Sequence, residues 1–557
     1  MQEINAVIAT INDLIWHNAV LIVVLLTGIL FTIWTRFSQL RSLTHGFALL
    51  GGKYADPSAP GAISHFQALS AAISGTVGLG NIGGVAIAVS LGGPGAVFWM
   101  WVVGFVGMAL KLTEVTLSML YRNVEDPRQP HGGPMWVARK AFAELGPGYA
   151  KVGRVVAVVF CVTLVVATLT TTMFQAWNVG EVTESYFSIP GIAAGIVMVV
   201  TVGLVIIGGI RRIGHVAGVL VPFMVVLYLV GGTIVLVLNA DQIPATIALI
   251  FKSAFSTTEA SGAFLGGTIG YAFLFGMKRA LFSNEAGQGS SPIVHSAART
   301  AEPVREGIVA GLEPFIDTLV VCTFSALVIL VSGVWNRAPE AAWSTPPEFV
   351  AGTAPGEWTL ERTLAPQVTK DPWSIDQTVY TIVSAGENRQ TGNTLHKLYG
   401  TVTLDAEQRW VIDWQPFASE TRPQVHAEGV YVSYVGAAMT ARAFDSAWDG
   451  LGKYLVTLAS WLFAVSTMIS WNYYGEQGVN YLFGQRAVLP YKLLFLALML
   501  LATTGIMRTA AEVDNLTTLG TGVMLLVNIP LTLLFANRAV RAYRAYVARL
   551  DAGQVRS

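Results

Sequence analysis

Long apolar runs separated by short polar connections dominate the chain. A transmembrane helix needs about 20 predominantly apolar residues, and eleven runs approach or exceed that length. They are Ile15–Trp34, Ala62–Leu91, Gly95–Tyr121, Val155–Trp177, Gly191–Ile210, Val216–Leu238, Phe264–Phe282, Gly307–Val331, Leu451–Trp471, Leu489–Ile506 and Leu519–Ala536. The pattern predicts an all-α polytopic membrane protein with eleven spans.

The segment between the eighth and ninth runs has a different pattern. It is polar and proline-rich at first, and then apolar and polar residues alternate, which is typical of strands. Candidate strands are Val379–Val383, Leu398–Leu404 and Trp410–Trp414, with a turn expected at Gly386–Asn388. We therefore expect a small β-rich insertion over residues 336–448.

Composition supports a membrane protein. Of the 557 residues, 53% are hydrophobic and 12% charged, about half the charged fraction of soluble domains. Cys161 and Cys322 lie within apolar runs, so we expect buried thiols and not a disulfide or a metal pair. The first run is too long for a signal-peptide core and is followed by Arg36, so we expect it to be retained.

Lysine and arginine in the short loops predict the orientation, because cytoplasmic loops are rich in both. The basic loops begin with Arg36, Arg41 and Lys53 and alternate with loops that carry little beyond Lys252 and Arg508. The bias places the N-terminus and residues 332–448 outside and the C-terminus in the cytoplasm. A multi-pass protein of the plasma (inner) membrane is expected.

The second run is interrupted by the stretch Ser74–Gly84, which holds five glycines. Each glycine costs roughly 1 kcal/mol relative to alanine inside a helix, and broken backbone in lipid occurs only where it is buried or lines a cavity. The stretch therefore suggests free amides and carbonyls for a small cation or a zwitterion. Close helix packing is the alternative explanation.

A second broken stretch spans Phe275–Pro292. If the first run is set aside, the two breaks lie in core spans one and six, which cross the membrane in opposite directions. Glycine-interrupted segments at corresponding places of two inverted halves indicate a transporter's substrate site. An ordinary cytoplasmic loop is the alternative for this stretch alone.

A few polar groups lie at membrane depth. Lys111 and Glu114 are three residues apart, so they can pair on one helix face. Glu313 and Asp317 share a face and could serve ions or protons. We expect His215 and His295 to be solvated near the cytoplasmic boundary.

Other polar residues allow both structural and functional roles. Gln175, near a helix end, could contact a ligand or act as a cap. Ser466 and Thr467 could bind a hard monovalent cation or bond back to their own helix.

At these residues the chain resembles the alanine or glycine:cation symporters, also called sodium:alanine symporters. Four segments carry the resemblance: Gly78–Ile82, Gly92–Trp101, Phe282–Pro292 and Ser470–Glu476. It covers nearly all of the chain from Thr35 to Ala536. Gln288 departs from the apolar residue expected in the family, and the insertion departs from its usual length.

The resemblance implies the leucine-transporter fold, a 5+5 inverted repeat, here with one extra N-terminal helix. The expected parts are 1–61 (extra helix and cytoplasmic loop), 62–238 (core helices one to five), 239–335 (six and seven), 336–448 (insertion), 449–538 (eight to ten) and 539–557 (basic tail). By motif match the substrate contacts are Thr76, Gly80, Asn81, Gln175, Gly276, Met277 and Phe282. The sodium ligands are carbonyls near Gly75 and Gly78 with the hydroxyls of Ser466 and Thr467.

The implied function is sodium-coupled import of a small neutral amino acid, alanine or glycine, by alternating access. An amino-acid-gated channel or nutrient sensor on the same fold is the alternative. An enzyme is not expected, because Glu114, Glu285 and Asp317 are scattered and form no catalytic set. The expected partners are the amino acid, co-transported sodium and the lipid bilayer, with no nucleic acid; the oligomeric state is left open.

Overall fold

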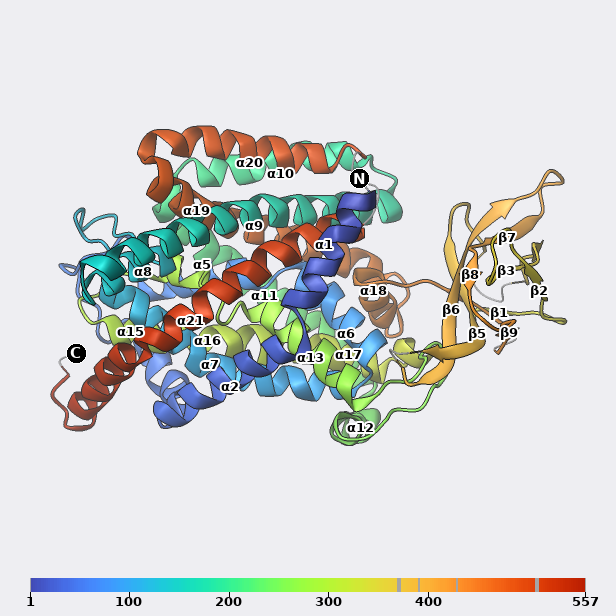
Figure 1. Cartoon of the computed structure of the whole chain (residues 1–557), viewed down its shortest axis with the longest axis horizontal. Helices are drawn as coiled ribbons and strands as arrows, with labels where there is room; N and C mark the ends of the chain where they lie inside the picture. Colours follow the sequence, from blue (N-terminus) through green and yellow to red (C-terminus); the bar gives the residue numbers. More distant parts are fainter. Residues whose placement is uncertain (1, 368–371, 389–390, 427–428, 506–509, 556–557) are drawn as a thin grey trace.

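The computed structural model describes residues 2–367, 372–388, 391–426, 429–505 and 510–555. It consists of a helical body and a smaller β-rich insertion that projects from one end of it (Figure 1). The two ends of the chain lie toward opposite ends of the helical body (Figure 1). Ile506 and Arg508, which the sequence analysis placed at the end of one run and in one loop, lie outside the described residues.

Helices account for nearly all of the body. They are α1 (Gln2–Ile15), α2 (Asn18–Trp34), α3 (Ser38–Arg41), η1 (Ser42–Gly46), α4 (Phe47–Leu50), α5 (His65–Thr76), η2 (Gly80–Gly84), α6 (Val85–Gly92), α7 (Gly95–Tyr121), α8 (Pro134–Ala143), α9 (Pro147–Phe187), α10 (Gly191–Ile206), α11 (Gly209–Leu238), η3 (Ala240–Gln242), α12 (Ile243–Ala254), α13 (Ile269–Asn284), α14 (Ser291–His295), α15 (Pro303–Ala310), α16 (Leu312–Pro314), η4 (Phe315–Cys322), α17 (Thr323–Val331), η5 (Val334–Asn336), α18 (Ala437–Asp445), α19 (Leu451–Phe483), η6 (Gln485–Ala487), α20 (Val488–Ala502) and α21 (Ala510–Asp551).

Within the described residues, eight helices are long and apolar enough to cross a membrane, or up to nine if the bent pair His65–Thr76 and Gly80–Gly92 is one span. The two remaining predicted spans correspond to the shorter helices α10 and α13, each of 16 residues. Every predicted run thus overlaps a helix. The fold class, a helical polytopic membrane protein with a small β-rich insertion, is confirmed.

α7 lies at the centre of the helical body. It packs against α13, α15, α2, α12 and α21, and 21 of its 27 residues are buried. α9 forms long contacts with α19, α21 and α8. α7 also contacts α6, and α19 contacts α5, so both broken spans pack against these longer helices.

The insertion contains two antiparallel sheets. The larger has the strand order β1-β10-β5-β6-β7-β4, with β9 on β5, and the smaller is β2-β3-β8. The strands are β1 (Ala341–Ala342), β2 (Phe349–Ala351), β3 (Glu357–Leu360), β4 (Thr363–Leu364), β5 (Thr378–Asn388), β6 (Asn393–Leu404), β7 (Trp410–Trp414), β8 (Phe417–Ala418), β9 (Gln424–Val425) and β10 (Gly429–Val432).

The three predicted strands are therefore present, as parts of β5, β6 and β7. The predicted turn at Gly386–Asn388 is wrong, because β5 continues through Asn388. The glycine there instead accompanies a shift of register between Ser384 and Asn388 in the pairing with β6. β5 advances from Ser384 to Asn388 while β6 advances only from Asn393 to Leu395, so β5 accommodates two extra residues without ending.

The insertion contacts the helical body at the loop before α13. The Tyr380 hydroxyl donates to the Ala263 carbonyl at 3.3 Å, and Asn393 Nδ2 donates to the Leu265 carbonyl at 2.6 Å. This loop is held by two isolated β-bridges, Thr258 with Gly267 and Ser261 with Phe264. Consequently α13 begins at Ile269 and not at the predicted Phe264.

After β10 the chain enters α18, which covers the first broken span. The Thr440 hydroxyl donates to the Ile82 carbonyl at 2.9 Å. A Cβ added at Gly83 would lie 2.8 Å from the Ala437 amide nitrogen. α18 therefore packs directly on η2, at the end of the body that bears the insertion (Figure 1).

Candidate functional site

The first broken span leaves helical geometry after α5. Val77 is extended, with φ −77° and ψ 96°, and the chain then resumes as the π-helix η2 followed by α6. The two halves are bent by 55°. Residues at such an end lack regular helical partners for their amides and carbonyls. The predicted break is thus present, and it is centred on residues 77–79.

The glycines of this stretch permit close approach by two neighbouring helices. A Cβ added at Gly75 would lie 2.9 Å from Tyr474 Oη, and one at Gly78 would lie 2.9 Å from Thr467 Oγ1 and 3.3 Å from Gln175 Nε2. Contacts under 3.0 Å are too short for a real side chain. Glycine at both positions therefore brings polar side chains of α19 and α9 against the exposed backbone.

Several of these polar atoms have no partner of their own. Thr467 Oγ1, Gln175 Oε1 and Tyr474 Oη are buried and make no hydrogen bond within the part of the chain that the structure describes. Buried polar atoms are nearly always hydrogen-bonded, so each exception needs an explanation such as an ion, water or ligand. Three exceptions converge on one side of the break.

The carbonyls of the break each retain acceptor capacity. The Gly75 carbonyl accepts from Trp471 Nε1 at 3.2 Å, and the Gly78 carbonyl accepts from the backbone amide of Asn81 at 3.0 Å. A carbonyl oxygen has two lone pairs, so one remains on each. The Ser466 hydroxyl donates to the Phe463 carbonyl of its own helix at 2.9 Å, which leaves its oxygen free to accept.

On its other side the break contacts α13 and η4 through Asn81. Asn81 Nδ2 donates to Asp317 Oδ1 at 2.6 Å and to Ser283 Oγ at 3.0 Å. Ser283 and Thr318 also donate to the Asp317 carboxylate, at 3.0 and 2.8 Å. Because Asn81 Oδ1 accepts from the Gly78 amide at 2.9 Å, this one side chain connects both sides of the break.

Arg279 packs onto the glycine face of η2. A Cβ added at Gly80 would lie 2.1 Å from Arg279 Nη2, and one at Gly84 would lie 1.9 Å from Nη1. The guanidinium also lies 5.0 Å from the centre of the Phe282 ring. Arg279 and its neighbour Lys278 both lie within α13, inside the predicted seventh run.

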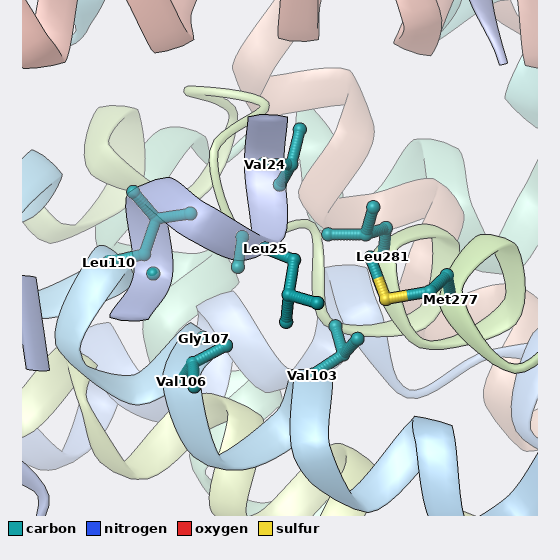
Figure 2. Close-up of a pocket in the computed structure, with 10 residues that line it drawn as sticks. Val24, Leu25, Val103, Val106, Gly107, Leu110, Met277 and Leu281 are labelled. Atoms are coloured by element: carbon teal, nitrogen blue, oxygen red, sulfur yellow. The ribbon is translucent and has the colours of Figure 1, made fainter. Parts of the chain in front are cut away.

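Two of the predicted substrate residues lie on another face of α13. A Cβ added at Gly276 would lie 2.4 Å from the Ala96 carbonyl of α7. Met277 and Leu281 line a small apolar cavity with residues of α2 and α7 that include Val24 and Val103 (Figure 2). The described contacts of Gly276 and Met277 are therefore with α7 and α2, whereas Thr76, Gly80, Asn81, Gln175 and Phe282 lie near the break.

The second break follows α13 directly. Glu285 adopts a left-handed conformation with φ 53°, as do Gly287 and Gly289 with φ 85° and 79°. Gln288, which differs from the apolar residue expected there, is fully buried, and its Nε2 donates to the Leu281 carbonyl at 2.9 Å. Gln288 therefore caps a carbonyl near the end of α13.

A buried charged network lies beyond the second break. Lys111 Nζ is 3.3 Å from Glu313 and 3.7 Å from Glu114, so the predicted Lys111–Glu114 pair is present. His295 is fully buried, 2.6 Å from Glu306. Its expected solvation is wrong, because Glu306 of α15 and Glu313 of α16 lie against it.

The same network separates Glu313 from Asp317. Although they are four residues apart, Glu313 pairs with Lys111 and His295, and Asp317 contacts Asn81, Ser283 and Thr318. Asp317 and Arg279 were not among the predicted substrate or sodium residues, yet both lie against the first break. Gly80 and Gly84 are four residues apart and therefore lie on one helix face. This spacing was the signal in the sequence for a side chain, here that of Arg279, that packs closely on that face.

Comparison with known proteins identifies relatives for most of the chain. The model of the sodium:alanine symporter family matches residues 1–354 and 421–557. The unmatched residues, 355–420, fall within the insertion, in agreement with its departure from the usual family length.

Two of the curated relatives match nearly the whole chain, and a third matches a smaller part of it. The sodium/alanine symporter AgcS of Methanococcus maripaludis is 31% identical over 97% of this chain and 97% of its own. The putative sodium/proton-dependent alanine carrier protein YrbD of Bacillus subtilis is 31% identical over 97% of this chain and 92% of its own. The probable sodium/glutamine symporter GlnT of the same species is 35% identical over 60% of this chain and 68% of its own.

The solved structures that match the chain include those of two transporters. MhsT in complex with L-phenylalanine matches with a TM-score of 0.45 and 12% identity, over 85% of this chain and 89% of that chain. A manganese transporter of Eremococcus coleocola matches with a TM-score of 0.46 and 14% identity, over 85% and 78%. On the family match and the two full-length relatives, the chain belongs to the sodium:alanine symporter family of membrane transporters.

Proposed function

We propose that this protein is a sodium-coupled symporter that imports a small neutral amino acid, alanine or glycine, across the plasma membrane. The observation that carries the proposal is the convergence of unpartnered buried oxygens on the first break. Thr467 Oγ1 and Gln175 Oε1 both lack partners within the described residues, and Thr467 Oγ1 and the amide nitrogen of Gln175 lie beside Gly78.

Sodium binds at the α19 side of the break. Its ligands are the carbonyls near Gly75 and Gly78 and the hydroxyls of Ser466 and Thr467. Unwound carbonyls coordinate sodium in transporters of this kind, and a hydroxyl adds a neutral oxygen. The ion then fixes α5 against α19, two helices that contact each other directly.

The amino acid binds in the same region, in contact with Thr76, Gly80, Asn81, Gln175 and Phe282. Gly276 and Met277 support this site from the α7 side of α13. The carboxylate of the substrate meets free amides at the break, where a helix N-terminus carries partial positive charge. Because Gln175 and Thr467 pack closely on Gly78, the site leaves little room for the side chain of the substrate.

Transport proceeds by alternating access. The broken spans and α7 move together relative to α9 and α19, and the occupied site faces first one side and then the other. The N-terminus and the insertion lie outside and the C-terminus in the cytoplasm, as the loop charges predict.

The test is uptake of labelled alanine and glycine into proteoliposomes with and without a sodium gradient. Thr467→Val removes a hydroxyl while preserving shape, and we expect it to raise the sodium concentration for half-maximal uptake about tenfold, which corresponds to ~1.4 kcal/mol. Thr457→Val is the matched control, because the Thr457 hydroxyl donates to the Lys453 carbonyl of its own helix.

Two results would contradict the proposal. Uptake that is equally fast without sodium refutes the coupling. An Asn81→Ala protein with unchanged alanine affinity refutes the assignment of the substrate to this break.

A further inference from the structure

The residues just before α5 pair with the loop that connects α14 to α15. The Ala62 amide donates to the Ala297 carbonyl at 2.8 Å, and the Arg299 amide donates to the Ile63 carbonyl at 2.8 Å. Ile63 and Ala298 form an isolated parallel β-bridge. The start of α5 is therefore held to this loop by the backbone, as one strand is held to its neighbour.

One arginine fastens both segments to the end of α7. Arg122 follows α7 directly and is 9% exposed. Its Nη1 donates to the carbonyls of Ser296 and Ala298 at 3.0 and 2.9 Å. Its Nη2 donates to the carbonyls of Pro60 and Thr300 at 3.2 and 2.5 Å. Because a guanidinium carries its donors in one rigid plane, this side chain fixes three chain segments relative to one another.

Glu306 adds a side-chain link between the same elements. It belongs to α15 and is 0% exposed. Its carboxylate contacts His65, the first residue of α5, and lies 2.6 Å from Nδ1 of His295, the last residue of α14. A hydrogen bond to a carboxylate is stronger than one between neutral groups. Three helices thus meet at one buried carboxylate.

The contact of α5 with α11 is of a different kind. A Cβ added at Gly214 of α11 would lie 3.0 Å from Ile63 Cγ2 and 3.3 Å from the Cβ of Gln67. Within the described part of the chain, no side-chain hydrogen bond or ion pair joins α5 to α11. Helices packed in this way can slide past each other by small amounts. α11 in turn packs on α19.

The first break would by itself allow α5 to swing alone. Val77 is extended, and the two halves of the span are bent by 55° where α5 ends. The other end of α5, however, carries the backbone pairing, the Arg122 hydrogen bonds and the contact with Glu306. These links bind it to α7, α14 and α15, so a swing of α5 alone would have to break all of them.

We infer that Arg122 and Glu306 are positioning residues that make the start of α5, α7, α14 and α15 one moving unit, which slides against α11 during transport. The inference rests on the proposed alternating access and deepens it, because it states which elements travel together. Residues 60–66 and 296–300 therefore stay in contact throughout the cycle, whereas α5 and α11 change their contact.

The first experiment uses two pairs of cysteines in the full-length protein in proteoliposomes. Ile63→Cys with Ala298→Cys lies within the unit, where paired backbones run about 4.8 Å apart. Gln67→Cys with Gly214→Cys lies across its boundary, with Cβ atoms 3.3 Å apart, near the usual spacing of about 3.8 Å in a disulfide. We expect the oxidised first pair to retain sodium-driven alanine uptake, and the oxidised second pair to lose it until the disulfide is reduced.

The oxidised wild-type protein is the control, since its own Cys161 and Cys322 are buried and unpaired. Loss of uptake in the oxidised first pair, restored by reduction, overturns the inference, because α5 must then separate from the loop. Full uptake by the oxidised second pair overturns the boundary between α5 and α11. Wild-type uptake without any sodium dependence overturns the proposed function itself.

The second experiment removes the arginine. We expect Arg122→Gln to raise amide exchange in residues 60–66 and 296–300 together and to slow alanine uptake. Arg128→Gln is the matched control, because the Arg128 side chain in the same loop is 83% exposed. Adding the first cysteine pair to Arg122→Gln and oxidising it should restore uptake, since the disulfide replaces the lost link.

A folded Arg122→Gln protein with unchanged exchange in residues 60–66 contradicts the role of Arg122. So does a failure of the oxidised first pair to restore uptake, since a residue needed only for the stability of α7 would give that result. If Arg122→Gln does not fold, the two cysteine pairs in the otherwise unchanged protein decide the inference.

Discussion

Replacing Gly78 with alanine inserts a methyl group between the broken span and the helices that face it. The new Cβ would lie 2.9 Å from Thr467 Oγ1 and 3.3 Å from Gln175 Nε2, whereas ordinary contacts begin near 3.4 Å. Gly78 does not have a positive φ, so the effect of the substitution is steric and not torsional. Thr467 must therefore move by roughly half an ångström.

The expected cost follows from this overlap. Adding a methyl group to a well-packed interior costs about 1–3 kcal/mol. If Thr467 is a sodium ligand, loss of its position weakens sodium binding by an amount of the same order, about 5- to 150-fold. We expect Gly78→Ala to lower thermal stability in detergent and to shift the sodium activation of alanine uptake to higher concentrations.

Two further variants separate packing from binding. Gly218→Ala is the matched control, since its Cβ would meet Phe66 of α5 at an ordinary 3.6 Å, and we expect little change. In the double variant Gly78→Ala with Thr467→Ala the overlap is relieved, so stability recovers while sodium activation stays weak. Recovery of sodium affinity in the double variant, or unchanged activation in Gly78→Ala, refutes the role of Thr467.

Three other predictions concern parts away from that contact. Gln288→Leu removes the hydrogen bond to the Leu281 carbonyl and should lower the free energy of unfolding by about 1 kcal/mol, measured by chemical denaturation; equal or greater stability refutes the capping role. Asn393→Ala removes the 2.6 Å hydrogen bond to Leu265 and should raise amide exchange in residues 258–268, with Asn388→Ala, whose side chain bonds within the insertion, as the control. Burial and the charge of Arg337 lower the pKa of Lys397 from 10.5 to about 8. Between these two pH values the folded insertion binds fewer protons than the unfolded chain, so its stability, measured as protection from amide exchange, should rise from pH 8 to pH 10. The Lys397→Met variant should lack that rise.

The spans could be predicted from the sequence because the bilayer imposes a minimum apolar length on each. The break at Ser74–Gly84 could be predicted for a similar reason, since clustered glycines disfavour a continuous helix. Alternation of apolar and polar residues was enough to find β5, β6 and β7. These features depend on local sequence and on the surrounding solvent.

The contacts around the break depend instead on residues far apart in the sequence. Asp317 meets Asn81 across 236 positions, and His295 is buried because Glu306 and Glu313 fold against it. A histidine beside a basic loop resembles a solvated residue until those partners are known. Met277 likewise faces α2 because the extra N-terminal helix packs there, and local sequence patterns do not specify that packing.

The ends of the insertion are joined before it reaches the helices. β1 pairs with β10 at Ala341 and Val430, and Arg337 donates to the Val432 carbonyl while Glu340 accepts from the Val432 amide. The connection between α17 and α18 is therefore closed near its base, like a short loop. The length of the insertion beyond that point adds little to the entropic cost of bringing the two helices together. This neck is a ready graft point, where a reporter or an affinity module could replace the natural sheet and follow the movement of α18 during transport.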